Sequence, residues 1–359
     1  MMNQIKQKTK IIKQLGYAVA GTLLAGMFSM ARADDGIRAN ADLLSRIQVT
    51  RNRFNDKPDI QDEQARLRLT GSYATGPVEL GARAGIYTTT VPNLLGPEFQ
   101  GNGSQNLDTD LLFDRASVKI KLSPPLSVSG GLLKQPNAGT IALIDSDRAS
   151  LEGRAEYENN GVKAEVWYST GTGVSVQNIS DTTSLGGQAS YTHKLGNTTL
   201  KGNLGIEEFL NLDSSENRTN SKDARFRIIN EGLSASLTTQ IGLVKVYGGA
   251  TQNLAMTENN KTWTAGVQIG EAKEPWSGKL TIEYDWTEKD GLRAERTLTG
   301  SPGTNYQIWK ARAELKATPN LSFYGFIGLP AHIMKTGPHD NETQTALEAG
   351  VVVTLPIGK

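Results

Sequence analysis

Polar and apolar residues alternate with a period of two over stretches of about ten residues through most of the chain. In residues 278–287, for example, Leu280 and Ile282 share one face, while Lys279 and Glu283 share the other. A period of two with one apolar face is typical of a half-buried β-strand. Ten residues is about the length that a tilted strand needs to cross a bilayer.

Fifteen stretches of the chain carry this alternation, and a weaker candidate at 43–51 would make sixteen. The alternative for 43–51 is a short periplasmic helix, because Ala39, Leu43 and Ile47 recur at helical spacing. The other stretches are 66–74, 78–88, 112–122, 126–133, 148–157, 162–168, 185–193, 199–209, 224–237, 243–251, 262–271, 278–287, 308–316, 321–329 and 345–355.

The connections between these stretches alternate between tight turns and long polar loops. Thr75-Gly76-Pro77 is short and is followed, one stretch later, by the long loop 89–111. A soluble β-sandwich has no reason to sort its loops in this way, whereas an outer-membrane barrel has short periplasmic turns and long external loops. The sequence therefore predicts an all-β fold, a transmembrane antiparallel β-barrel of about 16 strands, within a range of 14–18.

The N-terminus predicts export. Lys6, Lys8, Lys10 and Lys13 precede an apolar stretch, which ends at Ala31-Arg32-Ala33, a small-x-small pattern that signal peptidase cleaves. A single transmembrane anchor is the alternative, but the stretch is shorter than the roughly 20 apolar residues that a span needs. We expect a cleaved signal peptide at 1–33, an N-terminal segment with a first strand and loop at 34–65, and the barrel at 66–359.

Charge and cysteine content narrow the classes further. The whole chain has 38 basic and 37 acidic residues, and removal of 1–33 leaves 33 basic against 37 acidic, a net charge of −4. No basic excess remains to suggest a nucleic-acid partner. The absence of cysteine excludes thiol catalysis and zinc–thiolate sites.

One region of about 50 residues resembles a known family. Gly130-Gly131-Leu132-Leu133-Lys134-Gln135-Pro136-Asn137 ends one predicted strand, Asp145-Ser146-Asp147 lies in the next loop, and Leu151-Glu152-Gly153 opens the following strand. This arrangement is similar to that of a family of Gram-negative outer-membrane porins. The resemblance implies a pore-forming barrel in the bacterial outer membrane. The C-terminus, which ends in Pro356-Ile357-Gly358-Lys359, lacks the terminal aromatic residue that barrel-assembly machinery usually recognises.

Charged residues would line the interior of such a barrel, because Lys or Arg on the lipid face costs about 2–4 kcal/mol at the bilayer midplane. The predicted inward set holds 17 bases and 9 acids, an excess that favours anions. The alternative is that the charges pair across neighbouring strands and nearly cancel. The candidate pore-lining residues are Arg66, Arg68, Arg83, Arg115, Lys119, Lys121, Arg148, Glu152, Arg154, Glu156, Lys163, Glu165, Arg225, Arg227, Lys310, Arg312 and Glu314.

The loop at 136–147 has an apolar centre, Thr140–Ile144, which is unusual for a segment facing water. Contact with a neighbouring protomer or packing on the barrel rim would explain it. The sharper hypothesis is that the loop folds into the barrel mouth and constricts the pore, with Asp145 and Asp147 facing basic wall residues.

Aromatic residues near strand ends, among them Trp167, Phe209, Tyr306 and Trp309, are expected in girdles at the membrane interfaces.

We therefore expect a passive, water-filled channel for small hydrophilic solutes or ions, with weak anion selectivity and no enzymatic activity, cofactor, metal or catalytic residue. The expected partners are outer-membrane lipid and lipopolysaccharide, barrel-assembly machinery and small solutes, with a homotrimer as a candidate assembly. A secreted or surface-attached β-protein for adhesion or glycan binding is one alternative.

An outer-membrane hydrolase is the less favoured alternative. Only His193, His332 and His339 are available as bases, and none lies in a Gly-x-Ser-x-Gly context.

Overall fold

The computed structural model describes residues 37–52, 60–89, 108–134, 149–173, 183–211, 225–240, 242–291, 306–332 and 344–357. These residues form sixteen strands, and each strand pairs antiparallel with its neighbours in chain order. The strands are β1 (Ile37–Asn52), β2 (Ile60–Thr75), β3 (Val78–Thr89), β4 (Asp108–Ser123), β5 (Leu126–Lys134), β6 (Ala149–Asn159), β7 (Val162–Gly173), β8 (Thr183–Leu195), β9 (Thr198–Asn211), β10 (Arg227–Thr239), β11 (Gly242–Asn253), β12 (Lys261–Gly270), β13 (Ser277–Thr287), β14 (Tyr306–Thr318), β15 (Leu321–His332) and β16 (Gln344–Ile357).

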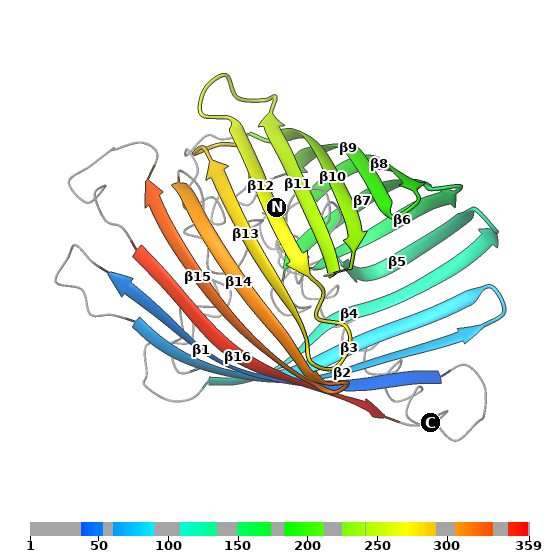
Figure 1. Cartoon of the computed structure of the whole chain (residues 1–359). Helices are drawn as coiled ribbons and strands as arrows, with labels where there is room; N and C mark the ends of the chain where they lie inside the picture. The colour runs from blue at the N-terminus through cyan, green and yellow to red at the C-terminus, as the bar shows by residue number, and fades with distance from the viewer. Residues whose placement is uncertain are drawn as a thin grey trace.

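The first and last strands close the sheet into a barrel (Figure 1). β1 pairs with β16 from Ala39↔Ile357 to Asn52↔Gln344. The candidate at 43–51 is therefore a strand rather than a helix, and the predicted count of sixteen is confirmed. The periodicity of Ala39, Leu43 and Ile47 also fits a strand, because residues four apart lie on the same face in both structures.

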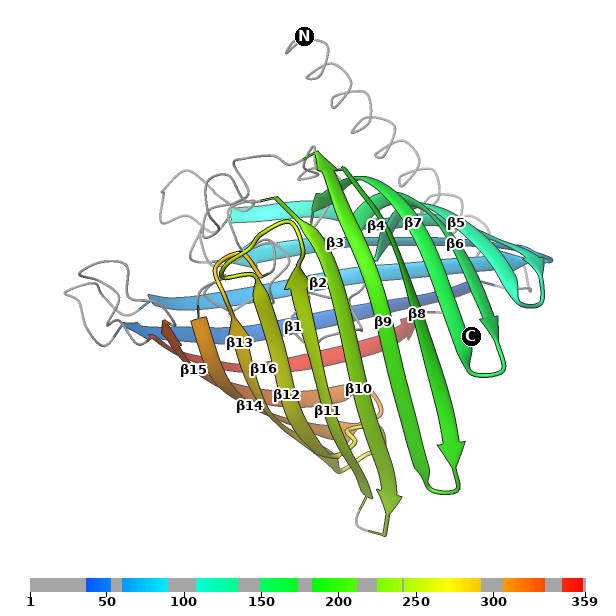
Figure 2. The ribbon, with the colours of Figure 1, turned by 90° about the horizontal axis from the view of Figure 1, so that it is seen from above.

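The tight turns lie at one end of the barrel, as predicted, and the described connection between β11 and β12 lies at the other. Figure 2 shows the turns that join β6 to β7 and β8 to β9 at the same rim. Between β6 and β7 the turn consists of Asn160 (φ 47°) and Gly161 (φ 82°). Asn-Gly is the preferred pair for a two-residue hairpin turn, because both residues need a positive φ. A Cβ on Gly161 would lie 2.4 Å from the carbonyl oxygen of Thr192, so no larger residue fits there.

Apolar side chains cover the outward face of the barrel. Leu233 is 74% exposed and Val166 59% exposed, and both lie on the face opposite to the charged residues of their neighbours. A soluble sandwich would bury such residues, whereas a barrel in lipid presents them to hydrocarbon chains. No helix in the described ranges is long and apolar enough to span a membrane.

The inward face is polar, and its packing changes along the barrel axis. Near the long-loop end, Ser150, Ser184 and Thr287 are fully buried. Near the tight-turn end, inward residues such as Lys121 and Lys201 are exposed. Over the described strands, the inner wall is therefore more exposed near the tight-turn end than near the long-loop end.

One buried amide joins three segments at the long-loop end. The side chain of Asn253 donates to the carbonyl oxygens of Arg225 (2.7 Å) and Asp290 (3.0 Å) and accepts from the backbone N–H of Ala255 (3.1 Å). These bonds fix the start of β10, the connection after β11 and the segment after β13 to one another.

Candidate functional site: the polar inner wall

Most of the predicted pore-lining residues lie on the inner wall, on the face that carries the buried polar residues. The residues placed there are Arg68, Arg83, Arg115, Lys119, Lys121, Glu152, Arg154, Glu156, Lys163, Glu165, Lys310, Arg312 and Glu314. The side chain of Arg66 and the residues Asp145, Asp147 and Arg148 lie outside the described set. The constriction by 136–147 therefore stays a prediction.

Arg225 and Arg227 do not line the interior, contrary to our prediction. Arg227 lies opposite Glu208 on the outward face, and the two side chains form an exposed ion pair of 2.5 Å. Arg225 is exposed just before β10, and Phe226 between them points inward and packs edge-on against Phe209. The charged outward positions lie at the long-loop end, where the lipid-depth penalty on charge falls to about 0–1 kcal/mol.

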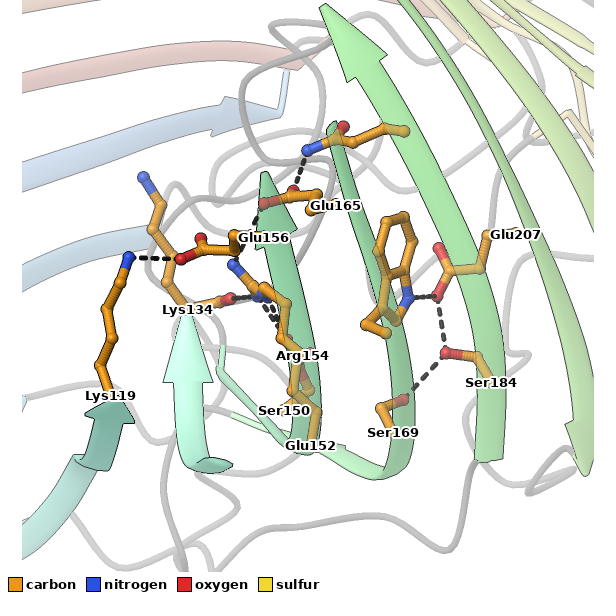
Figure 3. A network of polar contacts seen from close by, with 12 residues as sticks. Lys119, Lys134, Ser150, Glu152, Arg154, Glu156, Glu165, Ser169, Ser184 and Glu207 are labelled. Atoms are coloured by element: carbon orange, nitrogen blue, oxygen red, sulfur yellow. Dashed lines mark hydrogen bonds and ion pairs between the residues drawn. The ribbon is translucent and has the colours of Figure 1, made fainter. Parts of the chain in front are cut away.

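Two groups of ion pairs and hydrogen bonds lie side by side on the inner wall between β4 and β9, here together called the β4–β9 network (Figure 3). Lys119 contacts Glu156, and Lys163 lies 3.8 Å from Glu156 and 3.6 Å from Glu165. Arg154 continues the series, at 2.5 Å from Glu152 and 3.7 Å from Glu165. Glu156 and Glu165 each contact two cations and Glu152 contacts one, so the charges in this part of the network are largely compensated.

The β8–β9 end of this network is a buried carboxylate held by neutral donors. Ser184 donates to Glu207 at 2.7 Å, and the indole N–H of Trp167 donates to the same oxygen at 3.4 Å. Trp167 crosses the intervening strand over Gly186, where a Cβ would lie only 2.3 Å from the indole ring. The glycine is therefore what allows the indole to span β8.

Trp167 was expected in an interfacial girdle, but only 2% of its surface is exposed and it points inward. Phe209 and Tyr306 are likewise buried on the inner face, whereas Trp309 is exposed on the outer face as predicted. Position near a strand end does not decide the face, because alternation places every second residue inward.

A second group, the β11–β14 network, surrounds one lysine. Lys310 contacts both Glu283 and Asp285. Thr264 donates to Asp285 at 2.5 Å, and the Tyr247 hydroxyl donates to Glu283 at 2.6 Å. Nearer the turns, Glu314 pairs with Lys279 and with Arg312, each at 2.8 Å.

Five inward lysines of the described strands have no ion-pair partner among the residues that the structure describes. They are Lys121, Lys194, Lys201, Lys245 and Lys316. Most of the inward carboxylates, in contrast, are held by a base or a hydrogen-bond donor. The acids are thus largely neutralised by pairing, and a surplus of positive charge remains near the turn end.

Comparison with solved structures identifies the architecture. The chain superimposes on OprB of Pseudomonas putida with a TM-score of 0.59 at 10% identity, covering 89% of this chain and 94% of that one. The superposition on OccAB4 of Acinetobacter baumannii has a TM-score of 0.56 at 9% identity and covers 90% of this chain and 99% of that one. A loop-deletion mutant of OmpT, an outer membrane protein of Vibrio cholerae, gives 0.50 at 12% identity, with 89% and 100% covered.

The fold is that of an outer-membrane porin barrel. These neighbours are outer-membrane porins. No protein-family model matches the sequence, and a comparison with curated proteins finds no match. At such low identity the likeness carries the porin fold and not the solute that any neighbour takes.

The described part of the chain contains no group of three or more histidine, cysteine, aspartate or glutamate residues able to hold a metal ion. His193 is exposed and stacks on Tyr191, with the tyrosine hydroxyl 3.3 Å from the ring nitrogen Nδ1. Its hydrogen-bond contact is thus with a tyrosine on the same strand, and His339 lies outside the described ranges.

Sequence reasoning missed several residues of the inner wall. Trp167, Ser184, Tyr247 and Thr264 all hold carboxylates, yet none carries charge, so a search for inward charges passes over them. A glycine directly opposite an aromatic residue on the next strand could have indicated that the aromatic ring points inward. Gly186 lies opposite Trp167 and Gly266 lies opposite Tyr247.

Proposed function

We propose that this protein is an outer-membrane porin, a water-filled channel through which small hydrophilic solutes and ions diffuse passively. The observation that supports this proposal best is the closed barrel of sixteen strands with an apolar outer face and a charged inner face. Barrels of this strand number are wide enough to hold an aqueous channel. The tight turns would face the periplasm and the long loops the exterior.

Planar-bilayer recording tests the proposal. The mature protein, purified in detergent from outer membranes, should produce stepwise increases in current when added to a lipid bilayer in KCl. Heat-unfolded protein from the same preparation serves as the control. A folded, membrane-inserted protein that gives no conductance steps would contradict the channel function.

We propose further that the channel weakly prefers anions. The support is the set of inward lysines without an acidic partner among the described residues, namely Lys121, Lys194, Lys201, Lys245 and Lys316. Unpaired charge facing a narrow aqueous space raises the local concentration of the opposite ion. Reversal potentials under a KCl gradient should show chloride to be the more permeant ion, and a clear cation preference would contradict this.

We propose that the N-terminal segment is removed during export across the inner membrane. Mass spectrometry of the mature protein should show that it starts at Asp34, after cleavage behind Ala33. The expected partners are the lipid and lipopolysaccharide around the barrel, the barrel-assembly machinery and, in a homotrimer, two further copies of the chain.

A surface-attached β-protein for adhesion or glycan binding is the competing function. Such a protein would not need lipid to keep its fold. Retention of strand content and solubility after complete removal of detergent would therefore favour it over a channel.

A further inference from the structure

Two inward lysines without acidic partners lie close together near the tight-turn end. Lys201 is on β9 and Lys245 on β11, and two serines of β10 lie between them on the same face. Ser234 is directly opposite Lys201, and Ser236 is directly opposite Lys245. Each lysine therefore adjoins a serine hydroxyl on the strand that separates the two.

The residues directly opposite the two lysines on the flanking strands are uncharged. Thr192 lies opposite Lys201 on the β8 side, and Gln268 lies opposite Lys245 on the β12 side. Lys245 lies 5.3 Å from the ring centre of Tyr247, whose hydroxyl is engaged by Glu283. In the described part of the chain, no carboxylate pairs with either ammonium group.

Two like charges held on alternate strands repel one another, and the charge of Lys201 acts on the ammonium group of Lys245. β9 and β11 are roughly 10 Å apart, twice the spacing of neighbouring strands. The flexible four-carbon stem of lysine lets both ammonium groups turn toward one small anion placed over β10. Such an anion would relieve the repulsion.

We propose that Lys201, Lys245, Ser234 and Ser236 form a binding site for a small tetrahedral oxyanion, namely inorganic phosphate or the phosphate group of a small solute. Lysine binds phosphate as a point charge, without the two-pronged geometry of the arginine guanidinium. The site has two ammonium groups and no arginine. Two hydroxyls add hydrogen-bond donors that a non-directional binding of chloride does not need.

This inference rests on the proposed channel, because the site is useful only where a solute passes it. Ser234 and Ser236 are half-buried and Lys201 is exposed, so the group faces the water-accessible end of the lumen. An oxyanion would bind there before it leaves toward the turn end.

The experiment measures chloride current through the reconstituted protein while inorganic phosphate is added. Wild type should show a saturable fall in current as phosphate occupies the site. In the double variant Lys201→Ala and Lys245→Ala the half-blocking phosphate concentration should rise about tenfold or more, because two charge-assisted interactions are lost.

The matched control is the double variant Lys121→Ala and Lys316→Ala. It also removes two inward lysines without acidic partners near the turns, but these lie on distant strands, β4 and β14. Both double variants should move the reversal potential to a similar extent, while only the first should weaken the phosphate effect.

A charge-neutral variant separates the site from general attraction of anions. Ser234→Ala with Ser236→Ala should raise the half-blocking concentration about threefold and leave the chloride reversal potential unchanged. Equal weakening by both lysine pairs, or a wild-type channel that conducts chloride without any phosphate effect, would overturn the site while leaving the channel proposal standing. Absence of all conductance would instead contradict the channel itself.

Discussion

The two networks of the inner wall hold carboxylates in different ways. In the β4–β9 network the lysines keep contact with water, since the side chain of Lys163 is 46% exposed. In the β11–β14 network the side chain of Lys310 is only 12% exposed and lies against Asp285, which is fully buried. Exposed ion pairs contribute about 0–1 kcal/mol, whereas the loss of one partner from a buried pair costs about 3–5 kcal/mol. Lysines of the β4–β9 network therefore mainly set the charge of the lumen, whereas Lys310 in the β11–β14 network mainly stabilises the barrel.

The largest difference in the free energy of unfolding should appear between two lysine-to-methionine variants, one in each network. Lys310→Met leaves Glu283 and Asp285 buried beside each other without a cation, and we expect a loss of about 3–5 kcal/mol in the free energy of unfolding. Lys163→Met should cost about 1 kcal/mol or less, because Glu156 and Glu165 retain other partners. Urea titration of the folded barrel in detergent measures both, and equal losses would contradict the contrast.

The hydrogen bonds of Tyr247 and Trp167 should also contribute differently to the free energy of unfolding. Tyr247→Phe removes a 2.6 Å bond to the carboxylate of Glu283 and should cost about 1.5–3 kcal/mol. Trp167→Phe removes a 3.4 Å contact with Glu207, which Ser184 still serves, and the lost bond itself should cost about 0.5–1.5 kcal/mol. A larger loss in the tryptophan variant would show that ring packing outweighs the hydrogen bond.

The glycines beneath these aromatic rings provide a third test. A methyl group at Gly186 would meet the buried Trp167 ring at 2.3 Å and a backbone oxygen at 2.9 Å, so Gly186→Ala should cost about 1–3 kcal/mol. Gly266→Ala meets only the Tyr247 ring, which is less buried, and should cost less. Gly153→Ala is the control, since nothing lies within 4 Å of its added Cβ, and a change beyond roughly 0.5 kcal/mol there would question the steric argument.

The smallest effect should concern selectivity rather than stability. Glu156→Gln removes the carboxylate that both Lys119 and Lys163 contact. Lys163 keeps only Glu165 as a partner, so the net positive charge on the inner wall increases. The reversal potential under a KCl gradient should move slightly toward greater chloride permeability. Screening by salt limits the change, so it should grow as the mean ionic strength falls. A shift toward cations would show that Glu156 does not neutralise these lysines.

The sequence predicted the barrel well, because alternation and loop length are local properties. The sequence of 43–51 does not distinguish a strand from a helix, because residues four apart share a face in either structure. The pairing of β1 with β16 decided it, and that pairing joins the two ends of the chain.

Whether a side chain points into the barrel or outward is predicted correctly where one face of the strand is polar and the other apolar. The prediction fails where the two faces have similar chemistry. Around Arg227 both faces carry charge or aromatic groups, so alternation alone could not set the phase. The contacts within the two networks could not be predicted from the sequence. Lys119 and Glu156 are 37 residues apart, and Trp167 and Glu207 are 40 residues apart. Their contacts depend on strand register, which no local pattern encodes.

The pairing of β1 with β16 also sets the order of assembly. Every other strand can pair with a neighbour that left the ribosome just before it, but β1 waits for Gln344–Ile357, the end of the chain. Contacts so far apart in sequence form slowly, because the intervening chain must lose its entropy first. Until then β1 presents an unpaired edge, the usual starting point for strand-to-strand aggregation. The interval before closure is therefore when this chain is most prone to aggregate through that edge.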